Sequence, residues 1–245
     1  MPRKAQTRSI ADAHAAPGGA AAVDRALTLL GAFRAGDAEL SLTELAARTQ
    51  LYKSTALRLL ASLEHAGLLQ KLEDGRYALG TELARLHGIY AASFSLDRII
   101  VPVLQDLVAA TGESAAYHVR QGKGEDWARL CLYRVDSPHA VRDHVKAGDL
   151  LPADRGAGAR VLVAFGESTL PVSRQDRQLF TRIRADGFVA LVGDRHPDLA
   201  GISAPVFHAN GTLAGAITLT MPSHRYKPSQ IAPVKDAAMR LRGIV

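Results

Sequence analysis

The stretch Tyr52–Leu63 constrains the fold more than any other part of this chain. Its apolar residues recur at helical spacing and form one face: Ala56, Leu59, Leu60 and Leu63. The opposite face carries short hydroxyl side chains and a cation: Ser54, Thr55, Arg58 and Ser62. Such a face can bond phosphate oxygens and reach base edges in the major groove of DNA. Taken alone, the pattern also fits a plain surface helix.

A second helix is predicted just upstream. Ser41-Leu42-Thr43-Glu44 has the form of a capping box, in which Ser41 or Thr43 can accept from the first helical amides. This helix ends near Gln50, a few residues before the next one begins. Two short helices joined so tightly predict a helix-turn-helix with Tyr52–Leu63 as the recognition helix.

Two strands are predicted after the recognition helix. They are Leu68–Leu72 and Arg76–Leu79, and Glu73-Asp74-Gly75 forms the turn between them. A hairpin in this place corresponds to the wing of a winged helix-turn-helix.

Charge is compatible with a polyanionic partner but does not establish one. The chain has 30 Lys and Arg against 24 Asp and Glu, a formal net charge of +6. Residues 1–92 hold 11 basic and 9 acidic residues, so the expected DNA-binding half is not the more basic one. Binding would therefore depend on the local placement of a few cations.

The compartment is expected to be the cytoplasm. No apolar run approaches the roughly 20 residues that span a bilayer, and the start lacks a secretory signal. Cys131 is the single cysteine and lies in an apolar run, so we expect a small buried hydrophobic side chain there.

The predicted domains follow from these patterns. Residues 1–20 are expected to be a disordered basic tail, residues 21–81 the winged helix-turn-helix domain, and residues 82–95 a linker helix. The linker helix either pairs with a second copy of the chain or simply covers the domain.

Residues 96–245 are predicted to form an α+β domain. The sequence indicates a helix over Leu96–Thr111 that is interrupted near Pro102, and later helices around Ala159–Phe165, Ser173–Asp186 and Pro228–Leu241. The predicted strands are Ala115–Arg120, Trp127–Val135, Val141–Lys146, Phe188–Val192, Ile202–Phe207 and Leu213–Met221. Helices beside a mostly antiparallel sheet are typical of small-molecule sensor domains.

Several motifs resemble the IclR family of bacterial transcriptional regulators. In the first domain they are Arg25–Leu30, Leu42–Ala46, Lys53–Leu60 and Gly75–Gly80. In the second they are Gly156–Ala164, Ala204–Phe207 and Gly215–Thr220. The resemblance covers roughly residues 20–245.

The resemblance implies a one-component, ligand-responsive regulator of a catabolic operon. It further implies a homodimer or a dimer of dimers, and a GAF-like effector-binding domain for a small organic acid or aromatic metabolite. Carried over by position, the residues expected to contact operator DNA are Lys53, Ser54, Thr55 and Arg58, with Thr43 and Arg76 on phosphates. The residues expected to bind the ligand are Ala157, Gly158 and Ala159, through backbone amides at a helix start, and Thr218 and Thr220.

One position departs from the family pattern, and the role of another is open. Tyr52 stands where a proline is usual at the start of the recognition helix. Asp194 either hydrogen-bonds a ligand hydroxyl or is a solvated loop charge.

Other functional classes find little support. His139 and His144 lie near one strand, but the spacing of the histidines matches no zinc motif, so we expect no metal and no cofactor. Neither a nucleophile elbow nor a phosphate-binding loop is present, and we expect no catalysis. The alternative to a regulator is an enzyme or metabolite-binding protein that uses its winged domain for protein contacts.

Overall fold

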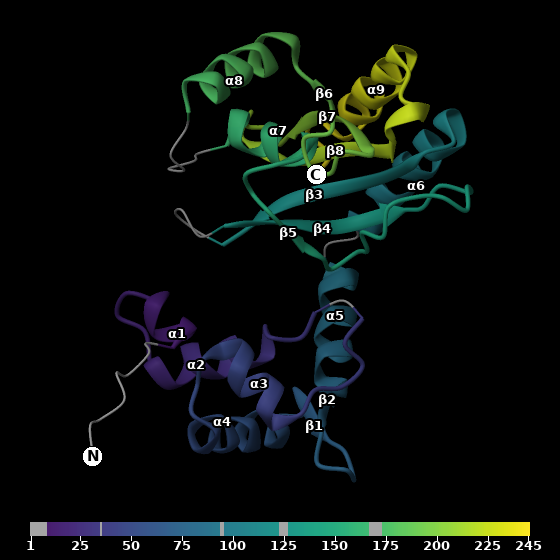
Figure 1. Ribbon diagram of the computed structural model, residues 1–245. Helices are drawn as coiled ribbons and strands as arrows, with labels where there is room; N and C mark the ends of the chain where they lie inside the picture. The colour runs from purple at the N-terminus through teal and green to yellow at the C-terminus, as the bar shows by residue number, and fades with distance from the viewer. Residues whose placement is uncertain (1–8, 35, 94–95, 123–126, 167–172) are drawn as a thin grey trace. The chain divides into compact units, whose positions relative to one another are not determined.

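The computed structural model describes residues 9–34, 36–93, 96–122, 127–166 and 173–245 (Figure 1). The chain forms two compact units, Met1–Phe94 and Ser95–Val245. The division falls at the end of the segment expected to be a linker helix.

The first unit is built around three helices. They are α2 (Ala21–Leu30), α3 (Leu42–Thr49) and α4 (Lys53–His65), and they enclose a core that includes Leu29, Leu45 and Leu60. The predicted capping box starts α3, because the Glu44 amide donates to Ser41 Oγ over 3.2 Å and the Ser41 amide donates to Glu44 Oε2 over 2.8 Å. Gln50 adopts a left-handed φ of 56° and turns the chain from α3 into α4.

The predicted wing is present. Strands β1 (Leu69–Lys71) and β2 (Tyr77–Leu79) pair in antiparallel fashion. Gly75, at a φ of 83°, supplies the left-handed backbone that the turn requires. An isolated bridge from Leu40 to Tyr77 adds a third segment to this small sheet.

The expected disordered tail is partly ordered. Residues 1–8 lie outside the described residues, but Ile10–Ala13 form a short helix, α1, that begins at a hydrogen bond from the Asp12 amide to Ser9 Oγ. Arg25 of α2 pairs with Asp12 at 2.7 Å. Disorder is therefore the wrong prediction for residues 9–13, because a single helical turn is too short to show periodicity.

Helix α5 (Thr81–Ser93) occupies the predicted linker segment. Three large apolar side chains along it are exposed in the single chain, Leu86, Ile89 and Tyr90. An uncovered apolar stripe of this kind is suited to a partner helix.

The second unit contains a six-stranded antiparallel sheet in the order β5-β4-β3-β8-β7-β6 (Figure 1). The strands are β3 (Ser114–Gln121), β4 (Ala128–Val135), β5 (Leu150–Leu151), β6 (Val189–Val192), β7 (Leu199–Phe207) and β8 (Leu213–Pro222). A bulge interrupts the β3–β4 register, because Tyr117 pairs with Tyr133 and His118 with Cys131, which leaves Leu132 without a partner.

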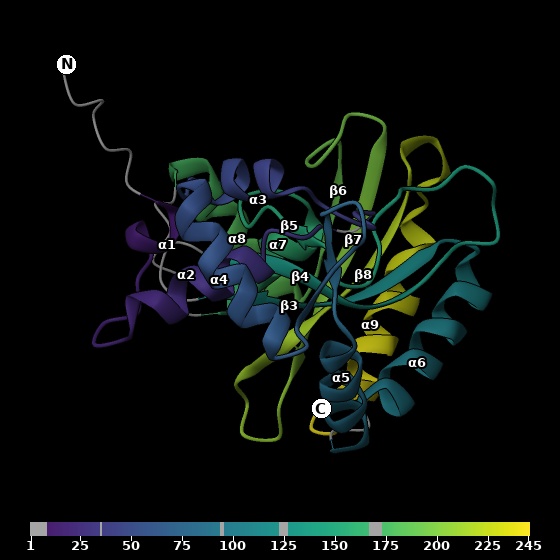
Figure 2. The ribbon, with the colours of Figure 1, turned by 90° about the horizontal axis from the view of Figure 1, so that it is seen from below.

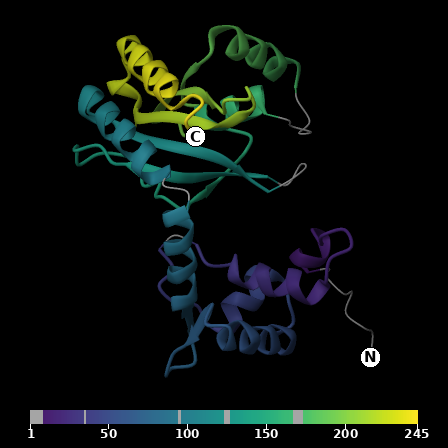
Figure 3. The same ribbon diagram turned by 180° about the vertical axis from the view of Figure 1, so that it is seen from behind.

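Helices cover both faces of this sheet. Helices α6 (Leu96–Thr111) and α9 (Ile231–Leu241) lie side by side against one face, as Figures 2 and 3 show. Helix α7 (Ala157–Phe165) packs on the other face, with α8 (Arg174–Asp186) against it. Two short 3-10 turns, Ser223–Arg225 and Pro228–Gln230, lead from β8 into α9. The predicted mixed helix and strand architecture is confirmed.

Two local predictions in this unit are wrong. Val141–Lys146 is a loop and not a strand, and the short strand β5 pairs with β4 instead. Asp143 and Val145 are nevertheless buried, so their alternation arises from loop packing and not from a strand. Helix α6 is also continuous through Pro102, which lies in its second turn.

Candidate nucleic-acid interface and ligand cavity

Helix α4 presents the polar face that its sequence predicts. Ala56, Leu60 and Leu63 are buried in the core of the first unit. Lys53, Ser54, Arg58 and Ser62 are exposed, and Thr55 is half-buried. Thr43, on α3, is exposed as well.

The two cations of α4 are available for an external partner. In the parts of the chain that the structure describes, no hydrogen bond or ion pair engages the side chain of Lys53 or Arg58. Arg58 instead lines an open surface groove with Ser54, Thr55 and Arg25. Unpaired guanidinium and ammonium groups beside hydroxyls are suited to phosphates and base edges.

Arg76 directly precedes β2 of the wing, and its guanidinium lies near two carboxylates of the chain. Its Nη1 lies 2.7 Å from Glu39 Oε1 and its Nη2 lies 3.6 Å from Glu44 Oε2. A phosphate would have to compete with these carboxylates for the guanidinium. Glu39 is 37 residues away in the sequence, so the pattern around Arg76 gives no sign of the pair.

A cavity opens in the second unit on the α7 side of the sheet. Its floor comes from β3, β4 and β8, and its walls from the start of α7 and the loops that carry Asp143 and Arg195. The lining residues are His118, Arg129, Arg134, Asp143, Val145, Leu151, Gly156, Ala157, Leu191, Asp194, Arg195, Leu199, Ala200, Gly201, Thr218 and Thr220.

Most of the expected ligand residues gather at this cavity. Ala157, Asp194, Thr218 and Thr220 line it. Gly158 lies just behind, because a Cβ built there would be 2.6 Å from Arg129 Nη1 and 2.8 Å from Thr218 Oγ1. Ala159 is fully buried and is not part of the lining.

Asp194 lines the cavity and is not a solvated loop charge, because groups of the chain bond its carboxylate. Its carboxylate accepts from the Gly156 amide over 2.5 Å and from Arg160 Nη2 over 3.0 Å. Burial acts to raise the pKa of Asp194, but the hydrogen bonds from Arg160 and Gly156 outweigh it and lower that pKa. Asp194 therefore occupies the amide of Gly156, the residue before the predicted cradle of Ala157, Gly158 and Ala159.

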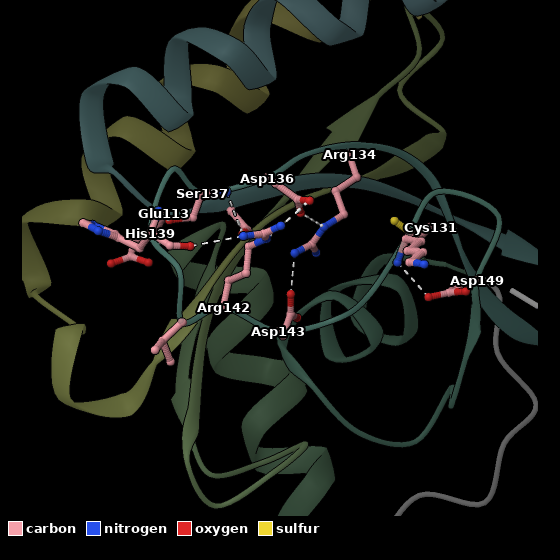
Figure 4. A network of polar contacts seen from close by, with 12 residues as sticks. Glu113, Cys131, Arg134, Asp136, Ser137, His139, Arg142, Asp143 and Asp149 are labelled. Atoms are coloured by element: carbon pink, nitrogen blue, oxygen red, sulfur yellow. Dashed lines mark hydrogen bonds and ion pairs between the residues drawn. The ribbon is translucent and has the colours of Figure 1, made fainter. Parts of the chain in front are cut away.

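An ion network borders the cavity and was not predicted. Arg134 lies between Asp136 and Asp143 and bonds both (Figure 4). Asp143 also accepts from Arg195 Nη2 over 2.5 Å. The bulge at Leu132 shifts the alternation of β4, so Arg129 and Arg134 face the cavity together although they are an odd number of positions, five, apart.

Arg129 is the unusual cation of this cavity. It is 3% exposed, and its Nε has no hydrogen-bond partner. No ion pair engages it among the described residues. Burial, together with the charge of Arg195, lowers the pKa of Arg129 to about 10, which still leaves the group charged at neutral pH.

His118 lies next to these cations. It is buried, and its Nδ1 is 3.2 Å from Thr218 Oγ1. Burial and the charges of Arg129, Arg134 and Arg195 hold the pKa of His118 well below its ordinary value, so its imidazole is neutral at pH 7. His118 and Arg129 are ionisable residues within two predicted strands, and both side chains face the interior of the domain. An ionisable residue at an inward-facing strand position is the signal that could have identified them.

The described residues contain neither a metal-binding cluster nor a membrane-spanning helix. No group of three or more His, Cys, Asp or Glu residues within them is placed to hold a metal ion. Nor does any helix described there have the length and apolar character needed to cross a bilayer.

Comparison with known proteins gives a consistent picture. The model of the IclR helix-turn-helix domain matches residues 22–73. A glycerol operon regulatory protein of Streptomyces coelicolor is 27% identical over 88% of this chain and 92% of its own length. The transcriptional regulator KipR of Bacillus subtilis is 22% identical over 82% of this chain and 88% of its own length.

Solved structures share the fold of the whole chain. An IclR-type regulator from a Silicibacter species has a TM-score of 0.77 at 24% identity, covering 90% of this chain and 94% of its own. An IclR homologue of Microbacterium hydrocarbonoxydans, solved with 4-hydroxybenzoate, has a TM-score of 0.77 at 19% identity, covering 90% of this chain and 97% of its own. At these identities the likeness is one of fold.

Proposed function

Because this protein belongs to the IclR family of transcriptional regulators, we propose that it is a one-component regulator whose operator affinity responds to a small molecule. Its relatives are named as transcriptional regulators, and it is not an enzyme. The proposed effector is a small organic acid or aromatic metabolite, and the proposed target is a catabolic operon read in the cytoplasm.

The proposal rests chiefly on α4. Its exposed face carries cations without partners among the described residues, beside hydroxyl groups, in a helix-turn-helix. We assign Lys53, Ser54, Thr55 and Arg58 to contacts with operator DNA. Thr43 and Arg76 are assigned to phosphates, and Arg76 must then exchange its contact with Glu39 for one with DNA.

The cavity of the second unit supports a ligand-responsive regulator. A buried guanidinium that forms no ion pair with any described residue favours an anionic ligand, since desolvating a charge is costly. The relative solved with 4-hydroxybenzoate has a ligand of that charge, and two relatives are named for the glycerol operon. Both facts are consistent with a metabolite effector and a catabolic target.

We propose that the protein acts as a homodimer or a dimer of dimers. The exposed stripe of Leu86, Ile89 and Tyr90 on α5 supports pairing between copies. A symmetric dimer reads two half-sites, so the operator is expected to be palindromic.

Selection of genomic DNA fragments on the purified protein tests this function. The selection is done at roughly physiological salt, where non-specific phosphate binding weakens. We expect an enriched palindromic site near catabolic genes. Absence of any enriched site, with the protein folded and with candidate metabolites present or absent, would count against an operator-binding regulator.

A further inference from the structure

The cavity holds a buried guanidinium, that of Arg129, which forms no ion pair with a described carboxylate. Asp143 is shared between Arg134 and Arg195, and Asp194 is held by Arg160. Asp143 and Asp194 attract Arg129 only from beyond ion-pair distance, and its side chain is 3% exposed. The buried guanidinium therefore favours an anionic ligand.

Two glycines at the start of α7 leave room for the guanidinium of Arg129. Its Nη1 lies 2.6 Å from the position that a Cβ of Gly158 would take, and its Nη2 lies 3.3 Å from the Cβ position of Gly156. Any side chain larger than hydrogen at Gly158 would collide with the guanidinium. Two glycines at the start of α7 thus keep the fork of Arg129 beside the cavity.

The hydrogen bonds around Thr218 determine which nitrogen of His118 carries the proton. Ser203 Oγ donates to the Ile217 carbonyl over 2.8 Å, so its only hydrogen is used. Thr218 Oγ1, 3.0 Å away, must then donate to Ser203 Oγ. Thr218 has no second hydrogen, and the neutral His118 must donate from Nδ1 to it.

The other nitrogen of His118 is consequently an acceptor. Its Nε2 is buried and has no hydrogen-bond partner among the described residues, and His118 lines the same cavity as Arg129. An unmatched acceptor in such a place requires a donor, and a hydroxyl group is the simplest small donor. The cavity thus pairs a site for an anion with a site for a hydroxyl group.

The space is small. The cavity has a free volume of about 30 Å³, whereas one water molecule needs about 10 to 15 Å³ on the same measure. Val145, Leu151 and Leu199 form its apolar wall. This small space favours a ligand of a few atoms over one with an aromatic ring.

We infer that the cavity binds a short aliphatic hydroxycarboxylate, whose carboxylate pairs with Arg129 and whose hydroxyl donates to Nε2 of His118. This inference rests on the proposed function, because it narrows the class of the effector. It separates a charged hydroxy acid from an uncharged polyol, which leaves Arg129 unpaired, and from an aromatic acid, which needs more space.

Isothermal titration of the full-length protein tests the ligand class. The probes are glycolate, lactate and glycerate, with propanoate, propane-1,2-diol and 4-hydroxybenzoate as comparisons, at matched ionic strength. We expect at least one of the three hydroxycarboxylates to bind about tenfold more tightly than propanoate, and the diol to show no binding. The inference is overturned if none of the three binds, or if the diol or 4-hydroxybenzoate binds at least as tightly.

Substitutions at Arg129 and His118 test the carboxylate contact and the hydroxyl contact separately. Arg129→Met is expected to abolish binding of every carboxylate, and Arg129→Lys to weaken it by at least tenfold, since the planar fork is lost. His118→Leu is expected to reduce the preferred hydroxycarboxylate to the affinity of propanoate and to leave propanoate unchanged. Arg240→Met, at an exposed ion pair with Asp106, is the matched control and should bind as the wild type does.

Further readouts keep the outcomes distinct. Circular dichroism establishes that each variant is folded; should Arg129→Met fail to fold, Arg129→Lys and the probe series carry the test. Unchanged lactate, glycolate or glycerate binding by a folded Arg129 variant would remove Arg129 from the site. Operator binding is measured separately, so a protein that selects an operator but binds no hydroxycarboxylate overturns this inference and leaves the proposed regulator in place.

Discussion

Arg160 and Asp194, 34 residues apart in the chain, are joined by two hydrogen bonds, from Nε to Oδ2 over 3.2 Å and from Nη2 to Oδ1 over 3.0 Å. The pair ties the first turns of α7 to the loop after β6. The Gly156 amide donates to the same carboxylate. Asp194 thus connects two segments at one side of the cavity.

Replacing this residue should loosen the cavity wall. Asp194→Asn is expected to lower the free energy of unfolding by about 1 to 2 kcal/mol at pH 7, because a charge-assisted pair becomes neutral. Urea denaturation measures the change. Asp154→Asn, in an exposed pair with Arg155, is the control and should stay within about 0.5 kcal/mol of the wild type.

The pair of Arg160 and Asp194 should make the free energy of unfolding depend on pH. The pKa of Asp194 is lowered in the folded protein, so its contribution is complete above the unfolded value of about 3.9 and is lost as the pH falls through the folded value. The stability gap between the wild type and Asp194→Asn should therefore be full at pH 6 and shrink below about pH 4. A constant gap across this range would contradict the ion-pair role.

Arg129 should destabilise the protein when no ligand is bound. Its pKa of about 10 lies below the usual value, so the folded state disfavours the cation and folding is opposed at pH 7. Arg129→Met is expected to raise the free energy of unfolding of the unliganded protein by about 1 to 3 kcal/mol. Thermal and urea denaturation without added carboxylates measure this, and a clear loss of stability would point to a partner for Arg129 within the fold.

Gly158 should tolerate no side chain. Gly158→Ala would place a Cβ 2.6 Å from Arg129 Nη1 and 2.8 Å from Thr218 Oγ1. We expect a loss of about 1 to 3 kcal/mol in the free energy of unfolding as these side chains are displaced. Gly88→Ala is the matched control, because nothing lies within 4 Å of its Cβ position in α5, and it should gain up to about 1 kcal/mol.

Arg58 should contribute to operator recognition. Arg58→Ala is expected to weaken operator binding by about 1 to 3 kcal/mol if the guanidinium contacts a base, with a smaller loss on unrelated DNA. Fluorescence anisotropy on the selected operator and on a scrambled duplex measures both affinities. Equal losses on the two duplexes would assign Arg58 to phosphate, and no loss on either would remove it from the interface. Arg240→Ala, on α9 of the second unit, serves as the control.

The apolar stripe of α5 should hold copies of the chain together. Ile89 is 51% exposed in the single chain, and Ile89→Glu places a charge in the middle of the stripe. We expect the mass in solution, measured by light scattering after gel filtration, to fall by half or more. An unchanged mass would place the interface elsewhere, and His87→Glu, on the same exposed helix, tests for a general effect of charge.

The sequence by itself determined the winged helix-turn-helix of the first unit and most elements of the second, but not helix α1, the loop at Val141–Lys146 or strand β5. Helical spacing in α4, the capping box at Ser41 and the turn at Gly75 are local patterns, and each acts within about a helical turn or a hairpin. For this reason the winged helix-turn-helix, the exposed face with Lys53 and Arg58, and the α+β class could be predicted. Thr218 and Thr220 were placed on one face by simple strand alternation.

Only the tertiary structure decided which charges meet. Asp143 lies in a loop that resembled a strand, and its partners Arg134 and Arg195 come from β4 and from a loop 52 residues away. The bulge at Leu132 reverses the alternation of β4 and turns Arg134 to the side of Arg129. Strand register and long-range ion pairs depend on how distant segments pack, and periodicity within one segment carries no information about that packing.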